Sequence, residues 1–202
     1  MNHSSASSCT AFVGKRSIAS GELVQVALKA QEAANHDKFA QVLIFDDATS
    51  ELVEVDLRGT PDDLRRRIAE TESGSVQSDG PVPEEGEARR PGRPKLGVVA
   101  REVTLLPRHW QWLASQPGGA SVALRKLVEQ ARKANEGSDR LRLAQEAAYR
   151  FLSAMCGNEG GFEEANRALF AGNRKRFAQV VDSWPSDLRD HAMKLAIRAF
   201  AD

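Results

Sequence analysis

The residues most suited to chemistry with another molecule form a basic run in the middle of the chain. Four cationic side chains occur between residues 89 and 95 with no acidic residue among them: Arg89, Arg90, Arg93 and Lys95. Pro91 and Pro94 disfavour a helix here and keep the backbone extended. Because cations on an extended backbone pair with phosphates and are attracted into the narrow minor groove of DNA, we predict that these four residues bind nucleic acid.

An acidic tract precedes this basic run and contains no cation: Asp79, Glu84, Glu85 and Glu87. Both tracts belong to residues 71–98, a stretch rich in Ser, Gly, Pro and Glu that cannot bury enough apolar surface to fold. We therefore predict a flexible linker over 71–98, first acidic and then basic. The run RRPGRPK resembles an AT-hook, which implies minor-groove binding. A basic stretch that only keeps the linker soluble is the alternative interpretation.

After the linker, residues 99–136 predict a unit of one strand and two helices. The segment REVTLLP indicates a short strand over 101–106 that ends before Pro107. A helix begins at Pro107, and the residues PGG end it. Three of its residues lie on one face: Trp110, Leu113 and Ala114. The second helix, with Ser121 as its predicted cap, has an apolar stripe at helical spacing: Leu124, Leu127, Val128 and Ala131.

This order of strand, helix, glycine turn and longer helix resembles the ribbon-helix-helix DNA-binding proteins. The L-P after the strand and the G-x-S…L-R-x-L-V that opens the second helix resemble that family too. The resemblance implies a homodimer in which residues 101–106 of two chains pair as one antiparallel ribbon in the major groove of DNA. It also implies that Ser121 and Arg125 lie at a phosphate, with Arg101 and Arg108 near the DNA backbone.

The sequence does not decide which face of this ribbon meets the bases. If Val103 and Leu105 point inward, Glu102 and Thr104 face the DNA, and in the other register Arg101 faces it together with the two apolar residues. Neither set contains the arginine, asparagine or glutamine pair that reads bases with two hydrogen bonds. The sequence therefore predicts little sequence specificity. A strand and two helices that pack into a larger helical domain are the alternative interpretation.

For covalent catalysis the chain offers one pair, Cys156 and His191, without a nearby third residue to orient the base. The four histidines are too scattered for a zinc site. Five acidic residues between 46 and 56 suit turns and exposed strand faces and lack the spacing of a calcium loop: Asp46, Asp47, Glu51, Glu54 and Asp56. We predict that the chain is not an enzyme and has no catalytic residues, metal or cofactor.

Residues 1–70 predict a small domain with the order βαββα. TAFVG indicates a strand, GELVQVALKAQEAA an amphipathic helix, and VLIF and LVEVDL a hairpin around the turn DDATS. The last helix begins at Pro61, where Thr60 suits the cap position. Asp62 and Asp63 then meet the positive end of the helix dipole.

Residues 138–202 predict only helices, separated by glycines and Pro185, so the fold class is α+β with a mostly helical C-terminal region. A formal net charge of zero over 202 residues excludes a chain that is basic throughout. Cys9 and Cys156 lie far apart and indicate free thiols in a reducing compartment. The chain shows no signal peptide and no apolar run near the roughly 20 residues of a membrane helix. We predict a cytoplasmic protein.

Several segments together closely resemble a bacterial family of unknown function, domain-of-unknown-function family 2239. They are the run from RRPGRPK to VEQARK, the earlier LIFDD and DLRG, and the closing DLRDHAMKLA. The resemblance implies no activity and no binding residues. From the residues we predict a DNA-binding protein or transcriptional regulator that acts through the basic linker and the strand-helix-helix unit. The alternative is a protein-interaction or scaffold protein without nucleic-acid binding.

Overall fold

The computed structural model describes residues 8–37, 39–74 and 101–200. It divides the chain into two compact units. Unit 1 combines Met1–Val76 with Gly137–Asp202, and unit 2 is Gln77–Glu136. The N-terminal and C-terminal parts of the chain therefore belong to one unit, although the sequence separates them by the linker and the strand-helix-helix region.

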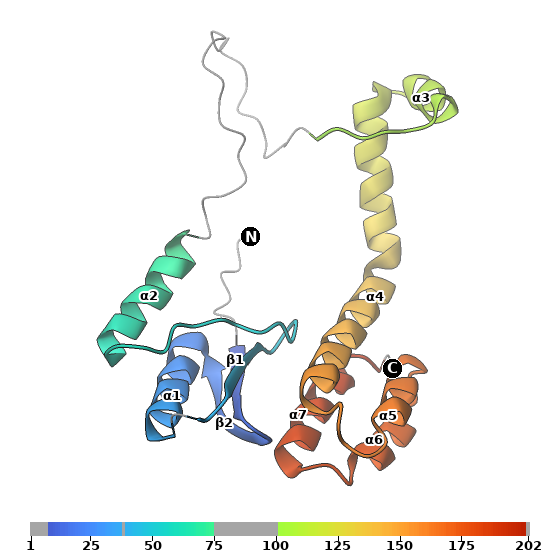
Figure 1. Cartoon of the computed structure of the whole chain (residues 1–202). Helices are drawn as coiled ribbons and strands as arrows, with labels where there is room; N and C mark the ends of the chain where they lie inside the picture. Colours follow the sequence, from blue (N-terminus) through green and yellow to red (C-terminus); the bar gives the residue numbers. More distant parts are fainter. Residues whose placement is uncertain (1–7, 38, 75–100, 201–202) are drawn as a thin grey trace. The chain divides into compact units, whose positions relative to one another are not determined.

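Unit 1 begins with a three-stranded antiparallel sheet (Figure 1). Strands β1 (Ser8–Val13) and β2 (Arg16–Glu22) form a hairpin, and β3 (Val42–Asp46) pairs with the other edge of β1, so that the order is β2-β1-β3. Helix α1 (Leu23–His36) packs on this sheet and buries small apolar side chains on one face: Val26, Ala27 and Ala30.

The α+β class is confirmed, but two elements of the sheet differ from the sequence prediction. Strand β2 precedes α1, where no strand was predicted, because pairing with β1 decides the conformation of this polar segment. The predicted strand over 52–57 reduces to one bridge, between Phe45 and Leu52. Side chains from two helices hold the following backbone away from β3: Gln31 Nε2 donates to Leu57 O at 2.8 Å, and Arg67 Nη2 donates to Asp56 O at 2.7 Å.

Helix α2 (Pro61–Gly74) begins where the sequence predicts. The Asp63 N–H donates to Thr60 Oγ1 at 3.2 Å, and the Thr60 N–H donates back to Asp63 Oδ2 at 3.1 Å. This reciprocal pair satisfies two backbone donors at the start of the helix. Leu64 and Ile68 then form a small apolar cluster with Ala27 of α1.

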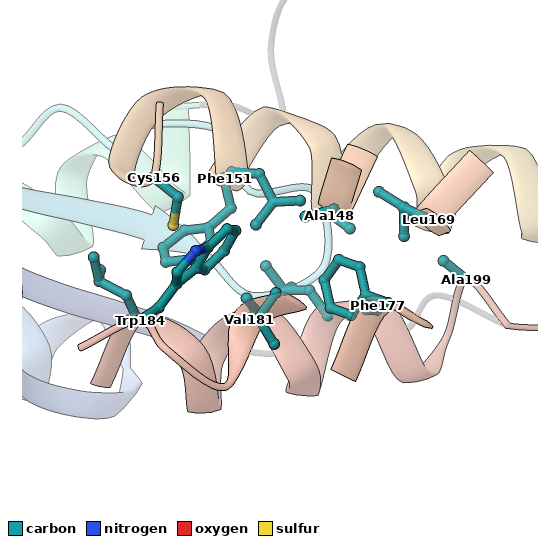
Figure 2. Close-up of a cluster of buried hydrophobic side chains, with 14 of the residues drawn as sticks. Ala148, Phe151, Cys156, Leu169, Phe177, Val181, Trp184 and Ala199 are labelled. Carbon is teal, nitrogen blue, oxygen red and sulfur yellow. The ribbon is translucent and has the colours of Figure 1, made fainter. Parts of the chain in front are cut away.

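The helical part of unit 1 surrounds one large apolar core, shown in Figure 2. This helical part consists of the C-terminal part of α4 (Gly119–Met155) and three shorter helices: α5 (Phe162–Phe170), α6 (Arg174–Val181) and α7 (Ser186–Ile197). Phe12 and Phe45 of the sheet join this core, with ring centroids 5.5 Å and 5.4 Å from that of Phe151. The sheet and the C-terminal helices therefore share one hydrophobic core.

In unit 2, helix α3 (Pro107–Ala114) and the start of α4 agree with the predicted helices and glycine turn. The turn needs glycine, because Gly118 and Gly119 have φ of 85° and 74°, where other residues are strained. The structure assigns no strand to 101–106. The predicted cap at Ser121 is wrong, since the helix begins two residues earlier, at Gly119.

The two helices predicted on either side of residue 137 are one continuous helix, α4. A single glycine inside a helix costs only about 1 kcal/mol relative to alanine, so Gly137 does not end it. Local side-chain contacts support the helix on both sides of that residue. Asn135 Nδ2 donates to Ala131 O at 2.9 Å, and Arg142 forms an ion pair with Glu146 at 2.8 Å.

Candidate functional site

Five of the predicted nucleic-acid-binding residues lie in the described part of unit 2: Arg101, Thr104, Arg108, Ser121 and Arg125. The other four, Arg89, Arg90, Arg93 and Lys95, lie outside the described residues, as does almost all of the predicted linker. The structure therefore describes the part of the predicted site that begins at Arg101.

Residues 101–106 carry the predicted dimer contact. Five of these six residues are exposed, with Val103 at 54% and Leu106 at 49% of their full surface, and Leu105 is half-buried. Within the described residues, this segment pairs with no strand. Apolar side chains on an unpaired segment resemble an edge strand that lacks its neighbour.

The two helices of unit 2 also leave large apolar side chains exposed. The predicted face of α3 is only partly buried: Leu113 is 3% exposed, whereas Trp110 is 42% exposed. In α4, every residue from 125 to 140 is exposed, and this includes Leu127 and Val128 of the predicted apolar stripe. Leu113 and Ala123 are the buried residues of the described part of this unit. Among the described residues, the apolar stripe is therefore present and largely uncovered.

The charges of this segment are mostly positive. Residues 101–136 contain six Lys and Arg against three Glu. Arg101, Arg108, Lys126 and Lys133 are exposed and form no ion pair within the described part of the chain. Arg125 Nε donates to Ser121 O at 3.1 Å, which holds its side chain along the first turn of α4. The N–H of Ser121 is among the first four of the helix, which have no acceptor inside a helix.

A second polar site, in unit 1, centres on Asp47, which the sequence analysis treats as an ordinary turn residue. This carboxylate is buried and accepts hydrogen bonds from Ser8 Oγ at 2.8 Å and Thr10 Oγ1 at 2.6 Å. Lys194 Nζ of α7 donates to it at 2.7 Å. Burial favours a raised pKa for Asp47, but the hydrogen bonds from Lys194, Thr10 and Ser8 outweigh it and lower the pKa below its ordinary value.

This network fastens the sheet to the last helix. Arg198 Nη1 adds a hydrogen bond to Asp47 O at 3.0 Å, and the Ser17 N–H of β2 donates to Asp187 Oδ2 at 2.9 Å. Lys194 lies 147 residues from its partner, so no local spacing in the sequence indicates this pair. In the sequence, α7 shows only the ordinary pattern of an amphipathic helix, with Lys194 on its polar face.

His191 occupies the inner end of this site. It is 7% exposed, and its ring lies against Phe12 and Phe151, with centroids 5.3 Å and 4.5 Å apart. Burial lowers the pKa of His191 to about 4, although the charge of Asp47 acts in the opposite direction. The imidazole is therefore neutral near pH 7. Its Nε2 has no hydrogen-bond partner among the described residues.

The thiol of Cys156 lies among the core side chains in Figure 2. Burial raises its pKa to about 12, with a further rise from Glu159, so the thiol carries its proton near neutral pH.

Within the described residues, no group of three or more His, Cys, Asp or Glu is arranged to hold a metal ion. Of the acidic turn, Asp46 Oδ1 accepts the N–H groups of Ala48 and Thr49, both at 2.8 Å. No helix in the described segments is long and apolar enough to cross a membrane.

Comparison with known proteins gives one match. A protein-family profile described as "Uncharacterized protein conserved in bacteria (DUF2239)" matches residues 8–196. No curated protein matches the chain. No solved structure matches it either.

Proposed function

Because the chain belongs to DUF2239, a family of uncharacterised bacterial proteins, we propose its function from its own residues: it binds double-stranded DNA as a homodimer through residues 99–136. The observation that supports this most is the combination of uncovered apolar faces and uncompensated cations in unit 2. The basic run of Arg89, Arg90, Arg93 and Lys95 directly precedes this unit in the sequence and extends its positive charge.

The apolar side chains support the homodimer. Leu113 and Ala123 are the buried apolar residues of the described part of unit 2, which is a small core, and units with small cores usually gain stability by oligomerisation. Full burial of one large apolar side chain contributes about 1.5–3 kcal/mol, and Trp110, Leu127 and Val128 are available for it. A second copy supplies a matching apolar face, because a two-fold interface uses the same surface on both chains.

The segment 101–106 supplies the ladder that joins the two chains. Two copies of it in antiparallel pairing would satisfy backbone groups that have no strand partner in the described structure. Leu105 is the least exposed side chain of this segment, which favours the register with Val103 and Leu105 inward and Glu102 and Thr104 toward the DNA. Neither of these outward residues reads a base pair by the arginine or amide patterns, so affinity rests mainly on phosphates.

The cations supply that phosphate contact. Arg101 begins the segment 101–106 and Arg108 follows it, and the side chain of Arg125 reaches back to Ser121 in the first turn of α4. A helix N-terminus favours an anion through its free N–H groups and its dipole. We therefore propose that the first turn of α4 and these three arginines hold the DNA backbone.

A second candidate function, a protein-interaction or scaffold role, rests on a different feature of the same unit. Trp112 is 51% exposed, and tryptophans are enriched at protein interfaces. In that case the apolar surface would bind another protein, and the cations would serve solubility alone.

The experiment that separates these functions is a titration of the full chain against unrelated DNA duplexes at several salt concentrations. A triple variant, Arg101→Ala, Arg108→Ala and Arg125→Ala, should lower the slope of log affinity against log salt by about 3, because each phosphate contact contributes about 0.9. A matched variant of exposed cations in unit 1, Arg65→Ala, Arg66→Ala and Arg174→Ala, should leave the slope unchanged. No binding of the wild-type chain at low salt would contradict DNA binding and favour the protein-interaction role.

A further inference from the structure

Strand β3 has an outer edge that is only half paired. Its inner edge pairs with β1 in one regular register from Val42 to Asp46. On the outer edge, the Asp46 N–H donates to Glu51 O at 3.0 Å, and the Val53 N–H donates to Ile44 O at 2.8 Å. Within the described residues, no backbone hydrogen bond joins β3 to the chain after Val53. The first half of β3 is therefore left without a strand beside it.

The hydrogen bond from Val53 shows which backbone groups face this open edge. In a strand, the N–H and C=O of one residue point to the same side, and the side alternates along the chain. Because the Ile44 carbonyl points away from β1, so do the Ile44 N–H and both backbone groups of Val42. None of these three groups has a hydrogen-bond partner among the described residues.

A groove of about 630 Å³ runs along this edge. One wall is β3 from Val42 to Ile44, and the other is the segment 52–58. The second wall is held away from β3, since Gln31 and Arg67 bind the backbone carbonyls of this segment at 2.8 Å and 2.7 Å. The volume lies within the roughly 300–1,000 Å³ of ligand cavities.

The other edge of the sheet, on β2, is protected against a further strand. The Ser17 N–H donates to Asp187 Oδ2 at 2.9 Å, so α7 covers part of this edge. The register between β1 and β2 also shifts at Ala11 and Phe12. Covered edges and irregular registers are common ways in which proteins prevent unwanted strand pairing. The half of β3 from Val42 to Ile44 has neither, which makes it the edge that accepts a strand.

We propose that the groove beside β3 binds an extended peptide of another protein, which adds a strand next to Val42–Ile44. An extended peptide carries backbone donors and acceptors at alternate residues, with the same spacing as the free groups of β3. This role lies in unit 1, so it stands or falls independently of DNA binding by unit 2.

The apolar side chains of the groove select one face of the peptide. Val42, Val53 and Val55 are partly buried and pack on the cluster that contains Val26 of α1 and Ile44. Side chains alternate between the two faces of a strand, so every second residue of an added strand would lie on this side. We therefore expect apolar residues at alternate positions of the peptide.

The charges of the groove select the other face. Glu54 follows Val53, so its side chain lies on the opposite face, where it is exposed and forms no ion pair with a described residue. Arg58 also lines the groove, but Asp56 already compensates it through an ion pair at 2.9 Å. The uncompensated carboxylate favours lysine or arginine at the remaining positions of the peptide.

The test is a titration of the full chain with a fluorescent, acetylated peptide that alternates valine and lysine, followed by anisotropy. We expect saturable binding. The same peptide with N-methylated backbone amides keeps its charge but lacks the ladder donors, so it should bind at least about tenfold more weakly. Hydrogen exchange should become slower at Val42 and Ile44 with the first peptide. It should not change at Leu43, whose N–H faces β1.

Two variants locate the peptide. Val42→Pro removes one free N–H at the first residue of an edge strand, where proline is tolerated, and should weaken binding about tenfold. Glu54→Gln should weaken binding about threefold, as expected for an exposed ion pair. Its matched control is Glu70→Gln, an exposed residue of α2 outside the groove, which should bind as the wild-type chain does.

Three results would overturn the proposal. Equal binding of the N-methylated peptide would leave only electrostatic attraction. Wild-type affinity in both Val42→Pro and Glu54→Gln would place the peptide elsewhere. Exchange at Ile44 that slows with protein concentration in the absence of peptide would mean that a second copy of the chain occupies this edge.

Discussion

The two units of this chain bury apolar side chains to very different degrees. In unit 1, four phenylalanines are fully buried: Phe12, Phe45, Phe151 and Phe177. In unit 2, Leu113 is the largest buried residue that the structure describes, while two tryptophans are 42% and 51% exposed. Unit 1 buries its own apolar core, whereas the apolar stripe in the described part of unit 2 stays exposed.

The two units also differ in whether their charged side chains are buried and paired. In unit 1, Asp47 is buried and holds hydrogen bonds from three side chains of β1 and α7. In unit 2, Arg101 and Arg108 are exposed and form no ion pair with described residues. A paired buried charge contributes to a fixed tertiary structure, whereas unpaired surface cations remain available to an anionic partner. The comparison supports our proposal of an intermolecular role for unit 2, whereas the polar groups around Asp47 hold unit 1 together.

The largest expected effect comes from truncating one aromatic residue in each unit. Phe151→Ala should lower the free energy of unfolding by about 3–5 kcal/mol, because it leaves a cavity in the shared core. Trp112→Ala should change it by less than about 1 kcal/mol, since an exposed side chain leaves no cavity. Urea unfolding measures both. Similar losses in the two variants would contradict the contrast between the units.

A smaller effect concerns pH and unit 1. The folded-state pKa of His191, about 4, lies below its ordinary 6.5, so the folded state binds fewer protons than the unfolded state. Stability is therefore complete above about pH 6.5 and falls as the pH drops toward 4, by about 3 kcal/mol in total, because each pKa unit corresponds to about 1.4 kcal/mol. Protonation of Asp47 would add a further loss at lower pH, as its lowered pKa implies.

Urea unfolding at a series of pH values tests this dependence. His191→Leu removes the titrating group and should flatten the curve between pH 6.5 and 4. His36→Leu changes an exposed histidine of α1 and should retain the wild-type curve. A wild-type curve that stays flat in this range would contradict a lowered pKa of His191 in the folded state.

The smallest expected effect concerns the proposed pairing of two chains through residues 101–106 of unit 2. Thr104→Pro should raise the dissociation constant of the dimer about tenfold, since proline removes one ladder donor and constrains the backbone. Thr104→Val keeps the N–H and a β-branched side chain, so it should leave the dimer intact. Sedimentation at micromolar concentration measures both. A wild-type chain that stays monomeric in that experiment would contradict pairing through residues 101–106.

Local sequence by itself determined the start of several elements. Thr60, Pro61 and Asp63 set the beginning of α2, and Pro107 sets that of α3, because caps and proline act on their own turn of helix. Each of these features depends on neighbours within a few residues.

Only the tertiary structure decided how the distant parts combine. After the bridge at Leu52, Gln31 and Arg67 bind the backbone at Leu57 and Asp56. Strand β2 exists because β1 pairs with it. Asp47 and Lys194 are separated by 147 residues, so their pairing leaves no periodicity or spacing to detect. Asp47 and His191 form the polar centre of unit 1 only because the fold buries them. Desolvation depends on what packs around a group and not on its neighbours in the chain.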